Sequence, residues 1–102
     1  MIHVLALVTA RPGQRDRILE AFRANVPNVL AEAGCIEYGA AVDAENALAF
    51  QTRFGPDTFV VVEKWESMDA LKAHAAAPHM AAYAAKTKEL IAGRAIHILS
   101  PA

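Results

Sequence analysis

Two kinds of hydrophobic pattern alternate along this chain: short stretches with a two-residue repeat, and longer ones whose apolar residues recur every three or four positions. Residues 58–66 have the two-residue repeat and are rich in β-branched and aromatic residues, which predicts a strand. In residues 2–9 both alternating sets are largely apolar, which predicts a strand buried on both sides. Residues 35–43 are predicted as another strand. Residues 50–54 are predicted as a short strand, followed by a turn at residues 55–57.

Residues 14–33 have the repeat of an amphipathic helix. One face of that helix collects the apolar residues Ile18, Leu19, Phe22, Val26, Val29, Leu30 and Ala33. Pro27 lies inside the pattern, so we expect it to kink or split the helix. Gly34 suits the left-handed residue that ends a helix.

A second helical region follows the strand at 58–66. Ser67 is a favourable N-cap for a short helix that runs to about residue 76. Pro78 fits the first turn of a further helical segment. We expect Gly93 to end that segment and residues 94–99 to form the last strand.

The order of these elements predicts an α+β fold, a ferredoxin-like split β-α-β arrangement with an antiparallel sheet. With 102 residues, the chain is expected to form a single domain over 1–102. Helices would cover one face of the sheet, but the other face also carries apolar residues. Pairing of two subunits sheet to sheet would cover it, so we expect a homodimer, a dimeric α+β barrel.

Composition supports a folded domain that needs a partner. Hydrophobic residues make up 55% of the chain and charged residues 21%, a high apolar share for so small an interior. The formal net charge is −1 and no basic run is present, so nucleic-acid binding is not expected. The first ten residues lack a positive segment before their apolar run, which is also too short for a membrane span. We therefore expect no membrane association and a cytoplasmic location.

Two histidines are the first candidates for chemistry. His79 follows Pro78 in the first turn of a helix, where the helix dipole favours neutral imidazole and so a general base. His74 lies five residues earlier, in reach of the same pocket. Each has an alternative interpretation as a structural histidine that makes local hydrogen bonds. Their spacing is not that of a helical metal pair, and one cysteine, Cys35, makes a cysteine-rich zinc site impossible, so no metal is expected.

Four further residues are candidates for the same pocket. Glu63 shares one face of its strand with apolar residues, and a buried carboxylate needs a partner or a proton. It is predicted to orient a histidine or bind a substrate hydroxyl, the alternative being a salt bridge. Trp65, Tyr38 and Tyr83 are candidates for substrate binding, with core packing as the alternative for each. No glycine-rich phosphate loop or dinucleotide fingerprint is present, so no cofactor is expected.

Several short motifs together resemble the antibiotic biosynthesis monooxygenase family. They are Gly34-Cys35 with Tyr38, E-x-W-E-S at 63–67, H-x-x-x-P-H-M-x-x-Y at 74–83, Arg11 to Gln14, and Ile96 to Leu99. Within the family, the segment with Phe50-Gln51 and Pro56-Asp57 looks like that of the quinol monooxygenases that oxidise menadiol.

The resemblance implies a cofactor-independent monooxygenase or oxidase that acts on a hydroquinone or polyhydroxylated aromatic with dioxygen. It implies catalytic roles for His79, His74 and Glu63, and a homodimer. Three alternatives stay open because a fold does not fix its chemistry. They are an isomerase or lyase acting on a small carbonyl compound or phosphorylated sugar, a haem-binding or haem-degrading protein, and a non-enzymatic dimer that binds an aromatic ligand.

Overall fold

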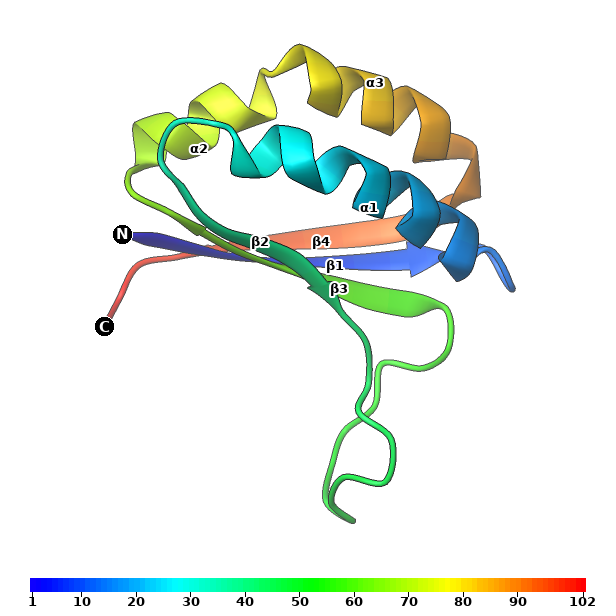
Figure 1. Ribbon diagram of the computed structural model, residues 1–102. Helices are drawn as coiled ribbons and strands as arrows, with labels where there is room; N and C mark the ends of the chain where they lie inside the picture. The colour runs from blue at the N-terminus through cyan, green and yellow to red at the C-terminus, as the bar shows by residue number, and fades with distance from the viewer.

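The computed structural model describes all 102 residues and has one sheet covered by helices on one face only (Figure 1). Its elements, in chain order, are β1 (Ile2–Ala10), α1 (Arg15–Leu30), β2 (Cys35–Ala41), β3 (Thr58–Trp65), α2 (Met68–Ala75), α3 (Pro78–Thr87), a 3-10 turn (Lys88–Leu90) and β4 (Ile91–Leu99). The strand order is β2-β3-β1-β4 and every neighbouring pair is antiparallel. This confirms the predicted α+β, ferredoxin-like fold.

The two faces of the sheet differ in how well they are covered. On β1, the side chains of Val4, Ala6 and Val8 are buried beneath the helices. Their neighbours Leu5 and Leu7 point to the other face, where Leu5 keeps 37% of its surface exposed. Within one chain, β1 is therefore covered on one face only, although the sequence predicts burial on both. We call the uncovered side the open face, made by Leu5, Leu7, Val60, Val62 and Leu99.

Helix α1 packs its predicted apolar stripe on the sheet, with Ile18, Leu19, Phe22 and Val29 buried. Pro27 does not split the helix, which continues to Leu30 and ends three residues before the predicted boundary. Proline removes only its own amide from the helix and keeps its carbonyl, which accepts a hydrogen bond from the amide of Ala31 at 3.2 Å. No helix of the structure is both long and apolar enough to cross a membrane.

The start signals of the next two helices are confirmed and the predicted stop at Gly93 is wrong. Ser67 caps α2 by accepting a hydrogen bond from the amide of Ala70 at 3.1 Å, and Pro78 occupies the first turn of α3. Helix α3 ends at Thr87, and Gly93 lies within β4 opposite Thr9. The register between β1 and β4 shifts beside this pair, so Gly93 lies next to a strand irregularity and does not end a helix.

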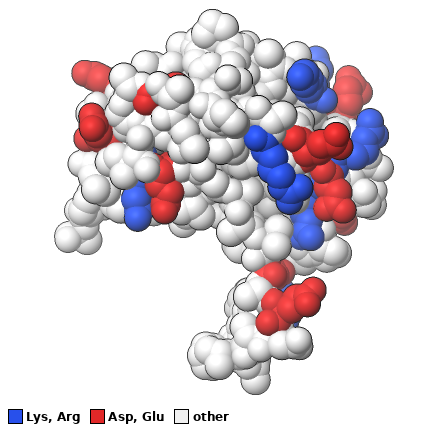
Figure 2. Space-filling view, viewed as in Figure 1, with Lys and Arg blue, Asp and Glu red and all other residues white.

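The predicted strand at 50–54 is also wrong. Residues 42–57, here called the arm, leave β2 and return to β3 as an extended loop on the side opposite the helices (Figure 1). No strand lies beside them, so their backbone has no ladder to join. The carboxylate of Asp43 closes the arm instead, accepting hydrogen bonds from the amides of Phe54 at 3.0 Å and Gly55 at 2.9 Å. Residues 46–52 of the arm include no Lys, Arg, Asp or Glu, and the lower end of the arm is white in Figure 2.

Candidate active site

An apolar cavity of about 680 Å³ lies between the helix-covered face of the sheet and helices α2 and α3. Of the 23 residues that line it, 17 are hydrophobic, so a ligand with a flat apolar body suits it better than a sugar. The lining residues with titratable or charged groups are Tyr38, Glu63, His74, Tyr83, Lys88 and Arg94. The structure therefore brings four of the six residues predicted for the site to one cavity.

His74 is the imidazole on the wall of this cavity. It lies in the last turn of α2 and keeps only 5% of its surface exposed. The Trp65 ring packs against it with centroids 4.6 Å apart, and the Tyr38 ring approaches edge-on at 5.5 Å. Packing on two sides restricts the ring to one orientation.

Glu63 places a carboxyl group on the same cavity wall. It lies on β3, is 7% exposed, and accepts a hydrogen bond from the indole Nε1 of Trp65 at 2.9 Å. Burial raises the pKa of the Glu63 carboxyl, against the opposing effects of the indole hydrogen bond and of nearby His74. The site thus combines an imidazole with a carboxyl group whose proton is held more tightly than usual.

Glu32 joins the two predicted histidines and was not predicted as a site residue. Nδ1 of His74 lies 2.8 Å from Oε2 of Glu32, within hydrogen-bond distance, and Nε2 of His79 lies 2.8 Å from the same oxygen. The three residues come from the turn after α1, from α2 and from α3. Nothing near Glu32 in the sequence signals this, because its partners lie 42 and 47 residues away.

The turn after α1 brings Glu32 to this position. Gly34 has a φ of +82°, and a Cβ at this residue would lie 2.6 Å from the Cβ of Ala70. Only glycine therefore allows the chain to pass this close to α2 in this conformation. The Gly34 carbonyl accepts a hydrogen bond from the amide of Glu66 at 2.8 Å, which fixes the turn against the end of β3.

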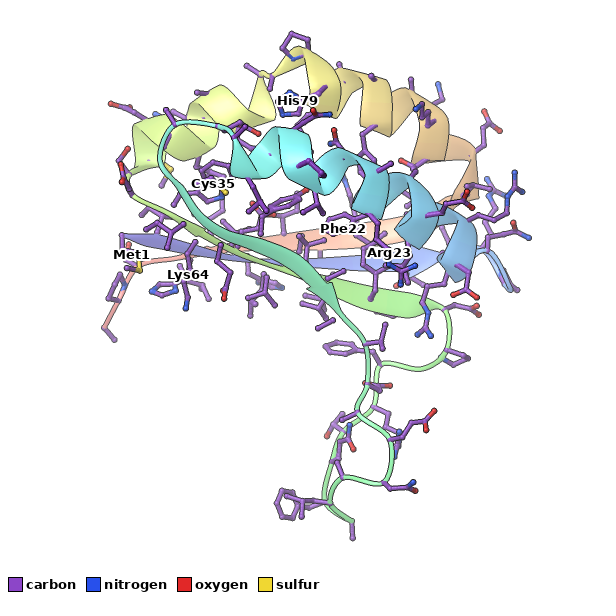
Figure 3. The ribbon with its side chains drawn as sticks, in the orientation of Figure 1. Met1, Phe22, Arg23, Cys35, Lys64 and His79 are labelled. Atoms are coloured by element: carbon purple, nitrogen blue, oxygen red, sulfur yellow. The ribbon has the colours of Figure 1, made fainter.

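His79 lies outside the cavity. It stands in the first turn of α3, on the side that faces α1 (Figure 3), and its side chain keeps 27% of its surface exposed. It is not among the residues that line the cavity. Its connection to the cavity runs through Glu32 to His74.

The predicted aromatic residues have separate positions. Trp65 is fully buried and stands behind His74 and Glu63 instead of lining the cavity. Tyr38 and Tyr83 do line it, and Phe22 contacts both, stacked on Tyr38 at 5.1 Å and edge-on to Tyr83 at 6.2 Å. Burial raises the pKa of Tyr83 to about 12 and raises that of Tyr38 further, so both hydroxyls stay protonated at neutral pH.

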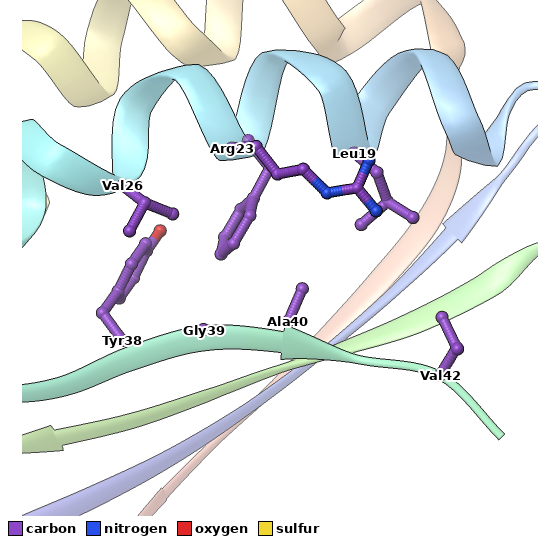
Figure 4. A pocket seen from close by; sticks show the side chains of 8 residues that line it. Leu19, Arg23, Val26, Tyr38, Gly39, Ala40 and Val42 are labelled. Atoms are coloured by element: carbon purple, nitrogen blue, oxygen red, sulfur yellow. The ribbon is translucent and has the colours of Figure 1, made fainter. Parts of the chain in front are cut away.

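A smaller cavity of about 250 Å³ lies between α1 and β2, on the other side of Tyr38 (Figure 4). Figure 4 shows the Tyr38 hydroxyl beside Val26 at one end of this cavity, with Arg23 above it. Apart from Tyr38 and Arg23, its lining carries no group that titrates. The candidate catalytic groups are therefore concentrated at the larger cavity.

Two other groups bear on the chemistry available. Burial raises the pKa of the Cys35 thiol, which makes a reactive thiolate unfavourable at neutral pH. Glu32, His74 and His79 each offer one ligand atom, and these atoms lie within 4.8 Å of one another. Two imidazoles and a carboxylate are a set that transition metals accept. The spacing of the two histidines gives no sign of this, because Glu32 brings them together.

Comparisons with known proteins identify the family to which this chain belongs. A model of the antibiotic biosynthesis monooxygenase family matches residues 1–86. The "Probable quinol monooxygenase YgiN" of Escherichia coli (strain K12) is 41% identical over 103 aligned residues, which cover 99% of this chain and 98% of that protein. The structure of Rv0793 from Mycobacterium tuberculosis has a TM-score of 0.80 and 26% identity, covering 99% of this chain and 94% of that one. A solved structure from Nitrosomonas europaea, 18% identical, shares the fold with a TM-score of 0.84 over 99% of this chain and 98% of that one.

Proposed function

The chain belongs to the antibiotic biosynthesis monooxygenase family, and we propose that it oxidises a hydroquinone or another polyhydroxylated aromatic with dioxygen, without a cofactor. One observation carries this proposal. The imidazole of His74 and the carboxyl group of Glu63 stand together on the wall of a cavity whose lining is otherwise mainly apolar. The 41% identity to a protein named a probable quinol monooxygenase supports the quinol as substrate class.

The chemistry requires a base and a dry pocket. Dioxygen is a triplet and reacts slowly with a closed-shell phenol, but a phenolate can donate one electron to it. An imidazole of the His74 and His79 pair takes the phenolic proton, a step worth roughly 10²–10⁴-fold in rate. Glu63, which holds its proton tightly, binds the second hydroxyl of the ring. Tyr38 and Tyr83 line the slot for the ring, and Trp65 holds His74 and Glu63 in place.

Two overall reactions balance. In the monooxygenase reaction, one oxygen atom enters the ring to give a hydroxyquinone and the other leaves as water. In the oxidase reaction, the quinol loses two electrons and two protons to dioxygen and the products are quinone and hydrogen peroxide. The apolar cavity supports both, because exclusion of bulk water protects the radical intermediates.

The functional unit is a homodimer in this proposal. The open face offers Leu5, Leu7, Val60, Val62 and Leu99 with no cover from the same chain. Exposed apolar patches of this kind mark interfaces, and a two-fold axis lets the same surface cover itself. Stacking of two such sheets gives the dimeric α+β barrel expected from the sequence.

A second candidate function has a specific observation in its favour. Lys88 and Arg94 are among the residues that line the larger cavity, and they suit an anionic group such as a phosphate. This supports an isomerase that moves protons on a small phosphorylated carbonyl compound with His74 and Glu63. Such an enzyme would turn over its substrate under strict anaerobiosis, whereas the oxygenase would not.

The test is oxygen uptake with freshly reduced menadiol, which autoxidises, so heat-denatured protein and buffer provide the background. We expect uptake above background for the wild type and at least 10²-fold less for His74→Ala. Lys72→Ala, an exposed change two residues away on the same helix, is the matched control and retains full activity. Measuring hydroxyquinone against hydrogen peroxide as product separates the monooxygenase from the oxidase. Uptake no faster than buffer would remove menadiol as substrate, and equal rates for His74→Ala and wild type would remove His74 as a base.

A further inference from the structure

We propose that Glu32 is the positioning residue of this site: it fixes the tautomer of His74, so that Nε2 of His74 is the base that faces the substrate. This role rests on the proposed quinol oxidation. It also divides the labour between the two histidines, because it leaves His79 to hold Glu32 in place and not to touch the substrate.

The contacts at Glu32 determine which nitrogens carry hydrogen. An ionised carboxylate accepts hydrogen bonds and donates none. Oε2 of Glu32 lies 2.8 Å from Nδ1 of His74 and 2.8 Å from Nε2 of His79. Both nitrogens are therefore donors, and a neutral His74 carries its hydrogen on Nδ1 and a lone pair on Nε2.

The Nε2 atom of His74 is free to meet a substrate. It makes no hydrogen bond to another protein group. Only two side-chain nitrogen or oxygen atoms are both buried and without a hydrogen-bond partner, and they are Arg15 Nε and Gln51 Oε1. Nε2 of His74 has no partner and is not one of them, so part of its surface is accessible. His74 lines the cavity and its Nδ1 is engaged by Glu32, so Nε2 is the ring nitrogen that is available to a ligand in the cavity.

The proton step then has a definite course. The quinol O–H bond breaks, its electron pair stays on oxygen, and an N–H bond forms at Nε2 of His74. The hydrogen on Nδ1 stays in place, and the resulting imidazolium faces the Glu32 carboxylate at 2.8 Å. A charge-assisted hydrogen bond of this kind is stronger than a neutral one, so Glu32 lowers the cost of the charged intermediate.

His79 completes the arrangement from outside the cavity. Its Nε2 contacts Oε2 of Glu32 from α3, and its side chain keeps 27% of its surface exposed. Loss of His79 removes one of two donors to Glu32 but leaves the contact between Glu32 and His74. Its removal is therefore expected to matter less than removal of Glu32.

The tautomer can be measured without any substrate. In ¹⁵N-histidine-labelled wild type at neutral pH, long-range ¹H–¹⁵N spectra are expected to show hydrogen on Nδ1 and a bare Nε2 for His74. In Glu32→Ala, His74 is expected to move to the Nε2-protonated form that free imidazole side chains prefer. Glu32→Gln keeps the size of the side chain and so guards against a folding defect. Glu20→Gln is the control, because it makes the same charge change on the exposed surface of α1. A wild-type His74 with hydrogen on Nε2 would overturn the proposal, even if no quinol is turned over.

Activity supplies the second readout. For the menadiol reaction we expect kcat to fall on the order of 10²-fold in Glu32→Ala and Glu32→Gln, with KM changing little, because Glu32 acts in the transition state and not in binding. His79→Gln should lower kcat by only roughly fivefold, the equivalent of one hydrogen bond. A loss in His79→Gln as large as in Glu32→Ala would overturn the division of labour and make His79 the base.

A metal titration tests the rival role of the same three side chains. Zn²⁺ or Fe²⁺ alone, added to protein treated with chelator, is expected to leave the His74 and His79 signals and the Tm unchanged. A stoichiometric shift of both histidines, with a rise in Tm that is absent in Glu32→Ala, would overturn the proposal by making Glu32 a metal ligand.

Discussion

The covered face of the sheet and the open face with its arm both carry large apolar and aromatic side chains. These side chains are buried on the covered face and exposed on the arm. On the covered face, Trp65 is fully buried and its indole nitrogen donates to Glu63. On the arm, Phe50 keeps 82% of its surface exposed and Phe54 keeps 54%. Contacts within one chain thus bury the centre of the covered face, although Ile96 and Ile98 on β4 stay about half exposed beside the cavity, whereas the open face and the arm lack a cover. The structure of the first region is internally determined, and that of the second calls for something outside the chain.

The largest effect should come from the centre of the covered face. Trp65→Ala removes a fully buried ring, the wall beside His74 and the donor to Glu63, so we expect the free energy of unfolding to fall by about 3–5 kcal/mol. Urea denaturation measures it. Phe50→Ala removes an aromatic side chain from the arm and, in a single chain, should change stability by less than about 0.5 kcal/mol. Equal losses for the two variants would contradict the contrast between the regions.

The sequence predicted the covered face well because its signals are local. The alternation in residues 58–66 gave β3 and placed Glu63 and Trp65 on one face, and the apolar stripe of residues 14–33 gave α1. Ser67 and Pro78 marked two helix starts correctly. These features depend on neighbours a few positions away, and a single sequence contains them.

The errors occur where distant contacts decide. Residues 50–54 resemble a strand by composition, but a strand needs a neighbour, and the arm has none. Gly93 resembles a helix stop, but the register against β1 makes it part of β4. Glu32 follows the apolar stripe as an ordinary surface residue would, and only the packing of α2 and α3 against the end of α1 makes it the partner of two histidines.

The open face offers the next largest effect. Leu5→Lys places an ammonium group near the middle of this face, opposite Val62, and a two-fold axis would bring it into the interface twice. Since a buried, unpaired charge costs several kcal/mol, we expect the dimer dissociation constant to rise by at least about 10²-fold. Sedimentation equilibrium over a range of concentrations gives the constant. Lys72→Glu, on the exposed side of α2, should leave it unchanged, and a wild type that stays monomeric throughout would refute the dimer.

Glu63 offers a smaller effect with a definite sign. Burial raises the pKa of this carboxyl in the folded state, so the folded protein binds the proton more tightly than the unfolded chain, whose pKa is about 4.3. The stabilisation is fully present below that value and is lost as the pH rises through the folded pKa.

Replacement of Glu63 by Gln should remove this loss, so the stability of the variant relative to wild type should grow across that window and then level off. The total gain should be about 1.4 kcal/mol for every tenfold difference in proton affinity between the folded and unfolded carboxyl. Parallel urea titrations at several pH values measure it, and a constant difference at all pH values would show that Glu63 is not perturbed by burial.

The smallest effect is expected in the arm. It distinguishes an arm held by the hydrogen bonds of Asp43 from an arm held by contacts with a second copy. The Asp43 carboxylate accepts two amide hydrogen bonds, and these two bonds hold its pKa below the usual range. Asp43→Ala should speed amide hydrogen exchange at Phe54 and Gly55 by roughly fivefold, the equivalent of one net hydrogen bond, while amides of β1 and β3 stay as slow as before. Asp57→Ala is the matched control at the last residue of the arm, because its carboxylate accepts a hydrogen bond from the amide of Gly13, which lies outside the arm. If exchange at Phe54 and Gly55 is slow in wild type and unaffected by Asp43→Ala, then closure by Asp43 does not hold the arm, which favours a cover from a second copy.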